Sequence, residues 1–103
     1  MSTDPVRLIE AEITLRPTAL GGRHGPIISG YRPGFRLRGV DTKYQFDAAI
    51  HLEAVNILGP GESTLARLAP FRPEFWTDVK PGDILHFYEG LREIGTATVI
   101  AIS

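Results

Sequence analysis

A glycine-rich loop near the N-terminus carries side chains that could bind an anion. Residues 21–26 read GGRHGP, so Arg23 and His24 stand between glycines and a proline. Arginine offers a planar fork of N–H donors and histidine a charge that changes near neutral pH, and both suit a phosphate or a carboxylate. The same pair could instead fasten the loop by donating to backbone carbonyls that a glycine-rich loop leaves unpaired. The residue types alone slightly favour this second, structural role.

Three arginines follow the loop, at Arg32, Arg36 and Arg38. The spacing of two residues places Arg36 and Arg38 on one face of an extended strand. That face could form an electrostatic strip for RNA phosphates or for an acidic partner. Alternatively, it is a solvated outer face that pairs with Glu10 and Glu12 of a neighbouring strand. The neutral overall charge balance slightly favours the solvated face.

An aromatic cluster with an interleaved arginine lies in residues 70–76, which read PFRPEFW. The two prolines exclude a central strand, so the segment is expected to be an edge or an irregular connection. Phe71, Phe75 and Trp76 could stack on nucleic-acid bases or anchor a partner protein. Because basic residues do not alternate with the rings, we favour protein contact or core packing over base stacking.

Catalytic chemistry has little support in the sequence. There is no cysteine, and the histidines His24, His51 and His86 lack the spacing of metal ligands. No serine lies in a nucleophile elbow. Asp83 and His86 are three residues apart and could meet at a turn, but they do not make an active site. We therefore expect no enzymatic activity, no metal and no cofactor.

The pattern of apolar residues predicts an all-β fold. Apolar and polar side chains alternate over most of the chain, as is typical of half-buried strands. Strands are expected at residues 9–15, 35–38, 44–53, 63–68, 84–88 and 92–102. Turn clusters of proline and glycine separate them. Short strands of this kind favour a small closed antiparallel barrel, because closure removes the exposed edges of a flat sheet.

Length and composition place this barrel in one ordinary globular domain. The chain of 103 residues is 43% hydrophobic and 22% charged, which excludes a disordered class. No apolar run approaches the ~20 residues of a membrane span. Residues 1–5 lack the features of a secretion signal. We expect a flexible N-terminus over residues 1–5, a single barrel over residues 6–103, and a cytoplasmic protein away from membranes.

Four segments in order resemble the C-terminal, third domain of bacterial elongation factor Tu. Residues 21–35 read GGRHGPIISGYRPGF, with Tyr31 inside a run similar to the family's GGRH(T)P…YRPQF. Residues 9–13 resemble the first strand of that domain, and residues 60–62 (PGE) match its Pro-Gly-Asp. Residues 89–95 (EGLREIG) read without gaps against its EGGRTVG. The resemblance covers nearly all of the chain and implies a six-stranded, Greek-key-like antiparallel barrel.

The resemblance also implies where partners would be contacted. In the family, the Glu-Gly that matches Glu89 and Gly90 lies at the T stem of aminoacyl-tRNA, in the same turn as Arg92. The family glutamine of YRPQF corresponds to Gly34, and a family arginine corresponds to Tyr88. The expected binding face therefore groups both arginine-bearing segments with this turn: Arg23, His24, Tyr31, Arg32, Arg36, Arg38, Glu89, Gly90 and Arg92.

Two functions from different classes follow. The GTPase of the elongation factor lies in its first domain, and its phosphate-binding Gly-x-x-x-x-Gly-Lys-Ser/Thr loop is absent from this sequence, so we expect no binding of GTP or GDP. The resemblance implies a non-catalytic binding module that docks on a translation-machinery protein or on tRNA. The alternative is a regulatory, antitoxin-like or self-associating structural protein that keeps only the fold. The replacements at Gly34 and Tyr88 favour the alternative.

Overall fold

The computed structural model describes residues 8–37 and 44–103, so the expected flexible residues 1–5 and Arg38 lie outside the described part. Within it the chain is all-β apart from two short 3-10 helices. In chain order the elements are β1 (Ile9–Leu15), η1 (Thr18–Leu20), β2 (Ile27–Ile28), β3 (Gly34–Phe35), β4 (Phe46–Leu52), β5 (Ile57–Leu58), β6 (Ser63–Pro70), η2 (Pro73–Phe75), β7 (Ile84–Glu89) and β8 (Arg92–Ile102).

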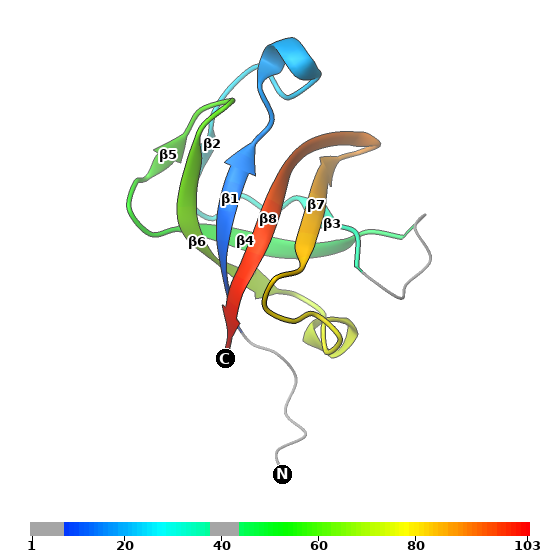
Figure 1. Cartoon of the computed structure of the whole chain (residues 1–103). Helices are drawn as coiled ribbons and strands as arrows, with labels where there is room; N and C mark the ends of the chain where they lie inside the picture. Colours follow the sequence, from blue (N-terminus) through cyan, green and yellow to red (C-terminus); the bar gives the residue numbers. More distant parts are fainter. Residues whose placement is uncertain (1–7, 38–43) are drawn as a thin grey trace.

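Six strands close into an antiparallel barrel in the order β1-β6-β4-β3-β7-β8, with β8 returning to β1 (Figure 1). Strands β3, β4 and β6 are neighbours, and β1 and β7 flank them on either side. This is the Greek-key arrangement, in which a fourth strand returns beside the far strand of a three-stranded unit. The predicted fold class is confirmed. Strands β1 and β3 lie on opposite sides of the barrel, three places apart in either direction.

Strand β1 shows why the sequence folds this way. Its alternate residues from Ile9 to Leu15 are fully buried in the barrel, whereas Glu10 and Glu12 face outward and are exposed. The alternation read from the sequence therefore identifies the two faces of this strand correctly.

The core of the barrel contains three aromatic rings that contact one another in a row. Phe35 of β3 packs edge-on against Trp76 with ring centroids 5.4 Å apart, and against Phe87 of β7 at 5.3 Å. All three side chains are fully buried. Of the two roles that the sequence left open for Trp76, core packing is therefore correct and contact with a partner is wrong, because the segment after η2 folds this ring into the core. Its Nε1–H has no hydrogen-bond partner among the described residues.

Gly95 of β8 lies where strands β1, β7 and β8 approach closely. A Cβ at this position would stand 2.6 Å from the carbonyl oxygen of Thr14 and would overlap the ring of Phe87. We expect Gly95→Ala to lower the free energy of unfolding by about 1–3 kcal/mol, the usual cost of overpacking a core. Denaturant unfolding measures the change. Gly25→Ala is the control, because nothing lies within 4 Å of a Cβ there; equal stability of the two variants would contradict this packing.

Two parts of the strand prediction are corrected. The second strand is β3, which covers only Gly34–Phe35 rather than residues 35–38, although the amide of Arg36 still bonds the carbonyl of His86 at 3.1 Å. Strands β2 and β5 form a separate two-stranded ribbon that the sequence pattern does not reveal. Strands of two residues are too short to produce a period-two signal.

Candidate binding face on β3

Strand β3 and its flanks alternate between the core and the outer surface. Pro33, Phe35 and Leu37 are buried, whereas Arg32 is exposed and Arg36 is partly exposed; Gly34, between the two arginines, is also buried. Arg32 and Arg36 thus lie on the same outer face, separated by Gly34. At a rise of about 3.3 Å per residue, their Cα atoms are roughly 13 Å apart. We call these two arginines, with the rings that they cover, the arginine strip: Arg32 on Phe71 and Arg36 on Tyr88.

Arg32 marks one end of the strip. Its guanidinium carbon lies 4.7 Å from the centroid of the Phe71 ring, which is 49% exposed. A guanidinium in this position is attracted by the π face and keeps its N–H donors in its own plane. The side chain is thus held in one orientation without using those donors. The structure therefore joins Arg32 to the predicted aromatic surface rather than to the loop with Arg23.

Arg36 marks the other end. Its guanidinium carbon lies 4.3 Å from the centroid of the Tyr88 ring. The Nε–H is buried and has no hydrogen-bond partner among the described residues. The expected pairing of this face with Glu10 and Glu12 is wrong, because β3 lies between β4 and β7, and β1 is across the barrel.

Gly34 leaves space in the middle of the strip for the side chain of Gln45, the residue just before β4. The side chain of Gln45 covers Gly34 closely enough that any Cβ there would overlap it. Its Nε2 donates to the carbonyl oxygen of Gly90 at 2.7 Å. The amide therefore crosses the outer face of β3 and ties the start of β4 to the β7–β8 turn.

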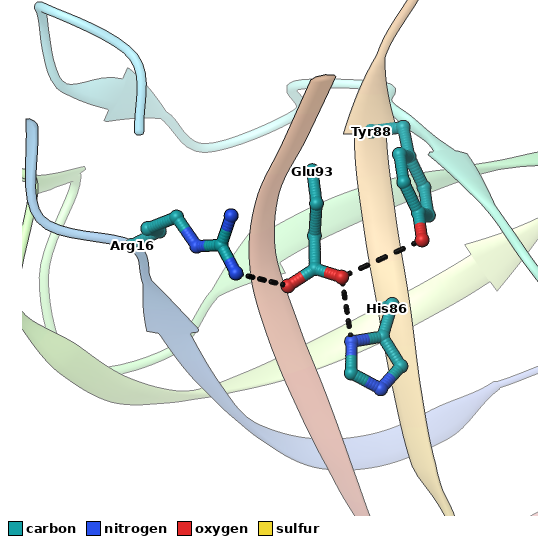
Figure 2. Close-up of polar contacts among 4 residues, drawn as sticks. All are labelled: Arg16, His86, Tyr88 and Glu93. Carbon is teal, nitrogen blue, oxygen red and sulfur yellow. Dashed lines mark hydrogen bonds and ion pairs between the residues drawn. The ribbon is translucent and has the colours of Figure 1, made fainter. Parts of the chain in front are cut away.

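Tyr88 is fixed by a polar cluster around Glu93 (Figure 2). The carboxylate of Glu93 lies 3.0 Å from Nη2 of Arg16 and 2.9 Å from Nδ1 of His86. The hydroxyl of Tyr88 donates to the same carboxylate over 3.4 Å. Glu93 thus links β7 and β8 to the end of β1 and holds the ring beneath Arg36. Of the pair Asp83 and His86 considered in the sequence, His86 contacts the carboxylate of Glu93. Asp83 accepts a hydrogen bond from the backbone amide of Lys80.

The glycine-rich loop meets the β7–β8 turn at Glu89. Tyr31 donates its hydroxyl hydrogen to Glu89, and Nε of Arg23 lies 3.3 Å from the same carboxylate without hydrogen-bond alignment. Arg23 also donates to the carbonyl of Pro26 at 2.7 Å and lies over the ring of Tyr31. Its charge and donors are therefore used within the fold, as the structural role predicted. His24 is exposed.

The Tyr31 hydroxyl remains protonated in this setting. Burial raises its pKa well above the ordinary value, and the hydrogen bond to Glu89 and the charge of that carboxylate act in the same direction. The charge of Arg23 opposes them. The phenol is therefore a donor that fastens the loop, which indicates a positioning role for Tyr31.

The predicted aromatic surface divides into two parts. Trp76 belongs to the core, whereas Phe71 and Phe75 stay about half exposed. Phe75 packs on Phe46 with ring centroids 4.9 Å apart and is covered by Arg72 at 5.1 Å. Arg72 in turn bonds Glu74 at 2.9 Å. The exposed Phe71 ring belongs to the strip at Arg32, whereas Phe75 packs on Phe46 at the start of β4.

The remaining predicted residues are placed as follows. Glu89 and Gly90 stand at the turn that Gln45 and Arg23 both contact, and Arg92 is exposed just beyond it. In the described part of the chain, no group of three or more His, Cys, Asp or Glu side chains could hold a metal ion. No helix in that part has the length and apolarity of a membrane span.

Sequence reasoning did not identify Arg16, Gln45 and Glu93, which position the strip. The hairpin could have revealed Glu93, because a two-residue turn at 90–91 places it directly across from Tyr88. No comparable signal exists for Arg16, which follows β1 and binds Glu93, or for Gln45, which precedes β4 and covers Gly34. No protein-family model matches the sequence. The relation to the third domain of elongation factor Tu therefore stays a prediction.

Proposed function

We propose that this barrel is a non-catalytic binding module, similar to the third domain of elongation factor Tu, that uses the arginine strip to dock on an anionic component of the translation machinery. The partner is tRNA or an acidic protein surface, and the complex forms in the cytoplasm. The module itself binds no GTP or GDP.

The observation that carries this proposal is how the arginines are paired. In the described part of the chain, each arginine that forms an ion pair does so with a glutamate: Arg16 with Glu93, Arg23 with Glu89, Arg67 with Glu53 and Arg72 with Glu74. Arg32 and Arg36 have no such carboxylate among the described residues and lie on aromatic rings instead. An arginine held on a ring keeps the planar donor fork that binds phosphate or carboxylate bidentately.

The departures from the family pattern also support this docking mode. The sequence has glycine where the family has a glutamine, yet the amide of Gln45 occupies the space over Gly34. It has Tyr88 where the family has an arginine, yet the guanidinium of Arg36 covers the Tyr88 ring. An amide and a cation are thus supplied from other positions of the chain. The losses at Gly34 and Tyr88 therefore weigh less against tRNA binding than the sequence suggests.

Removing both arginines tests the proposal. We expect Arg32→Ala combined with Arg36→Ala to weaken tRNA binding roughly tenfold, since exposed charge contacts contribute up to about 1 kcal/mol each. The salt dependence should also flatten by about one phosphate contact per arginine. Fluorescence anisotropy with labelled tRNA at two salt concentrations measures both quantities. If the partner is an acidic protein, the same change should mainly slow association.

A charge-matched control separates the strip from general basicity. Arg67→Ala with Lys80→Ala also removes two positive charges, from β6 and from the turn before β7. These residues make no contact with Phe71 or Tyr88, so affinity should change little. Equal losses in both double variants would show that the strip has no special role.

The alternative function, self-association of a regulatory or structural protein, is favoured by the exposed rings of Phe71 and Phe75. Sedimentation velocity over a range of concentrations distinguishes the two. A dimer that Phe71→Ser disrupts, in a protein that binds neither tRNA nor an acidic partner, would establish the alternative.

A further inference from the structure

The side of the barrel opposite the arginine strip is an outer sheet face with the reverse chemistry. It is centred on β1, with β6 on one side and β8 on the other, and it reaches the start of β7 beyond β8. The strand registers place Leu65, Glu12, Thr98 and Ile84 in one row across these strands. Leu65 and Ile84 are exposed at the two ends of the row. Aliphatic side chains therefore flank a glutamate on a solvent-facing surface.

A β-bulge beside Glu10, the second glutamate of this face, brings in a third aliphatic side chain. The register between β1 and β8 shifts between Glu10 and Ala11, so Ile100 is the extra residue of β8 at this point. Such a bulge re-aims a side chain. Ile100 is exposed and lines a hollow of about 140 Å³ with Glu10, Glu53 and Leu65.

The two central glutamates are available for a ligand. Neither the side chain of Glu10 nor that of Glu12 makes a hydrogen bond or an ion pair with any residue that the structure describes. Glu53, at the rim of the hollow, instead bonds Arg67 at 2.9 Å. The face thus combines unpaired negative charge with a hollow whose other walls are aliphatic.

We infer that this face, which we call the β1 face, docks a basic segment of a partner protein. An arginine or lysine side chain has an aliphatic stem and a charged end. Its stem fits against Leu65 and Ile100, while its head reaches Glu10 or Glu12. Apolar residues beside it on the partner would cover Ile84. Charge complementarity selects this occupant, because nucleic acid and anionic lipid are repelled by the two carboxylates.

The barrel would then have two docking faces of opposite electrostatic charge. The β1 face and the arginine strip lie on opposite sides of the closed barrel, so one partner leaves the other face free. A protein of this design would bridge an anionic component and a basic one. The two faces share no residue, so an experiment can contradict the proposal for one face and leave the proposal for the other unaffected.

A peptide titration tests the β1 face directly. The probe is a short synthetic peptide in which leucine and arginine alternate with serine, and its counterpart has glutamate in place of arginine. NMR spectra of the ¹⁵N-labelled chain should show shifts confined to β6, β1, β8 and the start of β7 at Ile84 with the basic peptide. Glu10→Gln with Glu12→Gln should weaken that binding about fivefold or more, and the acidic counterpart should not bind.

A matched variant and a second substitution keep the test decisive. Glu74→Gln with Asp78→Asn removes two acidic charges from the 70–80 segment and should leave peptide binding unchanged. Leu65→Ser should weaken binding without a change of charge. Three results would overturn the inference: no binding of the basic peptide at millimolar concentration, shifts elsewhere on the barrel, or binding unaffected by the Glu10 and Glu12 changes. A concentration-dependent dimer that these changes abolish would also overturn it, because the occupant would then be a second copy.

Discussion

Replacing Trp76 by alanine is expected to lower the free energy of unfolding by about 3–5 kcal/mol, the usual cost of deleting a large buried aromatic ring. The indole is fully buried and packs edge-on against Phe35, which also contacts Phe87. Its removal leaves a cavity beside Phe35, the ring that contacts both of the others. Urea unfolding followed by circular dichroism measures the loss.

The control for this prediction is Phe71→Ala. That ring is 49% exposed and contacts Arg32 at the surface, so its loss should cost less than about 1 kcal/mol of stability. The two variants also separate folding from binding, because Phe71→Ala should weaken docking at the arginine strip in a stably folded protein. A Trp76→Ala variant that is as stable as Phe71→Ala would mean that the indole is outside the core.

Ile50→Ala is the second large effect, with an expected loss of about 2–5 kcal/mol. The side chain is fully buried in β4. The backbone of Ile50 also accepts from the amide of Gly30 and donates to the carbonyl of Tyr31, both at 2.8 Å. A cavity here should therefore loosen the segment that leads into β3 as well as the core. In a small domain of marginal stability such a loss is a large share of the total.

Hydrogen exchange gives this prediction a second readout. Besides a lower unfolding midpoint, we expect faster exchange at the amide of Gly30 than in wild type. The exposed neighbour His51 supplies the control, because His51→Ala should alter neither quantity. A melting curve of Ile50→Ala that matches wild type would show that the faces of β4 are assigned the wrong way round.

The long strands could be predicted from the sequence because they have two different faces. The bounds of β1 and β8 agree with the alternation of apolar residues. In β4 the prediction extends too far, since Tyr44 is exposed and the strand begins at Phe46, which is only partly buried. An aromatic residue near a strand end continues the alternating apolar pattern even where its side chain is not buried in the core.

Barrel topology accounts for most of what the sequence could not reveal. The strand beside β3 decides whether Arg36 meets a glutamate of β1 or the ring of Tyr88. Strands β3 and β7 are neighbours in the barrel but are not successive in the chain, so the sequence does not reveal this contact. Trp76 shows the same limit, because the sequence left core packing and partner contact both open, and only the fold of the connection places the ring inside. The sequence identified Arg32 and Phe71 separately, and only the fold places them together.

The most direct test of the central claim, that the arginine strip is the anion-docking face, is an NMR titration of the ¹⁵N-labelled chain with tRNA. The expected result is that the largest shifts fall on the amides of residues 32, 34–36 and 88–90 and on the Nε–H signals of Arg32 and Arg36. Shifts that are absent, spread evenly over the barrel, or centred on Arg67 and Lys80 would contradict the claim.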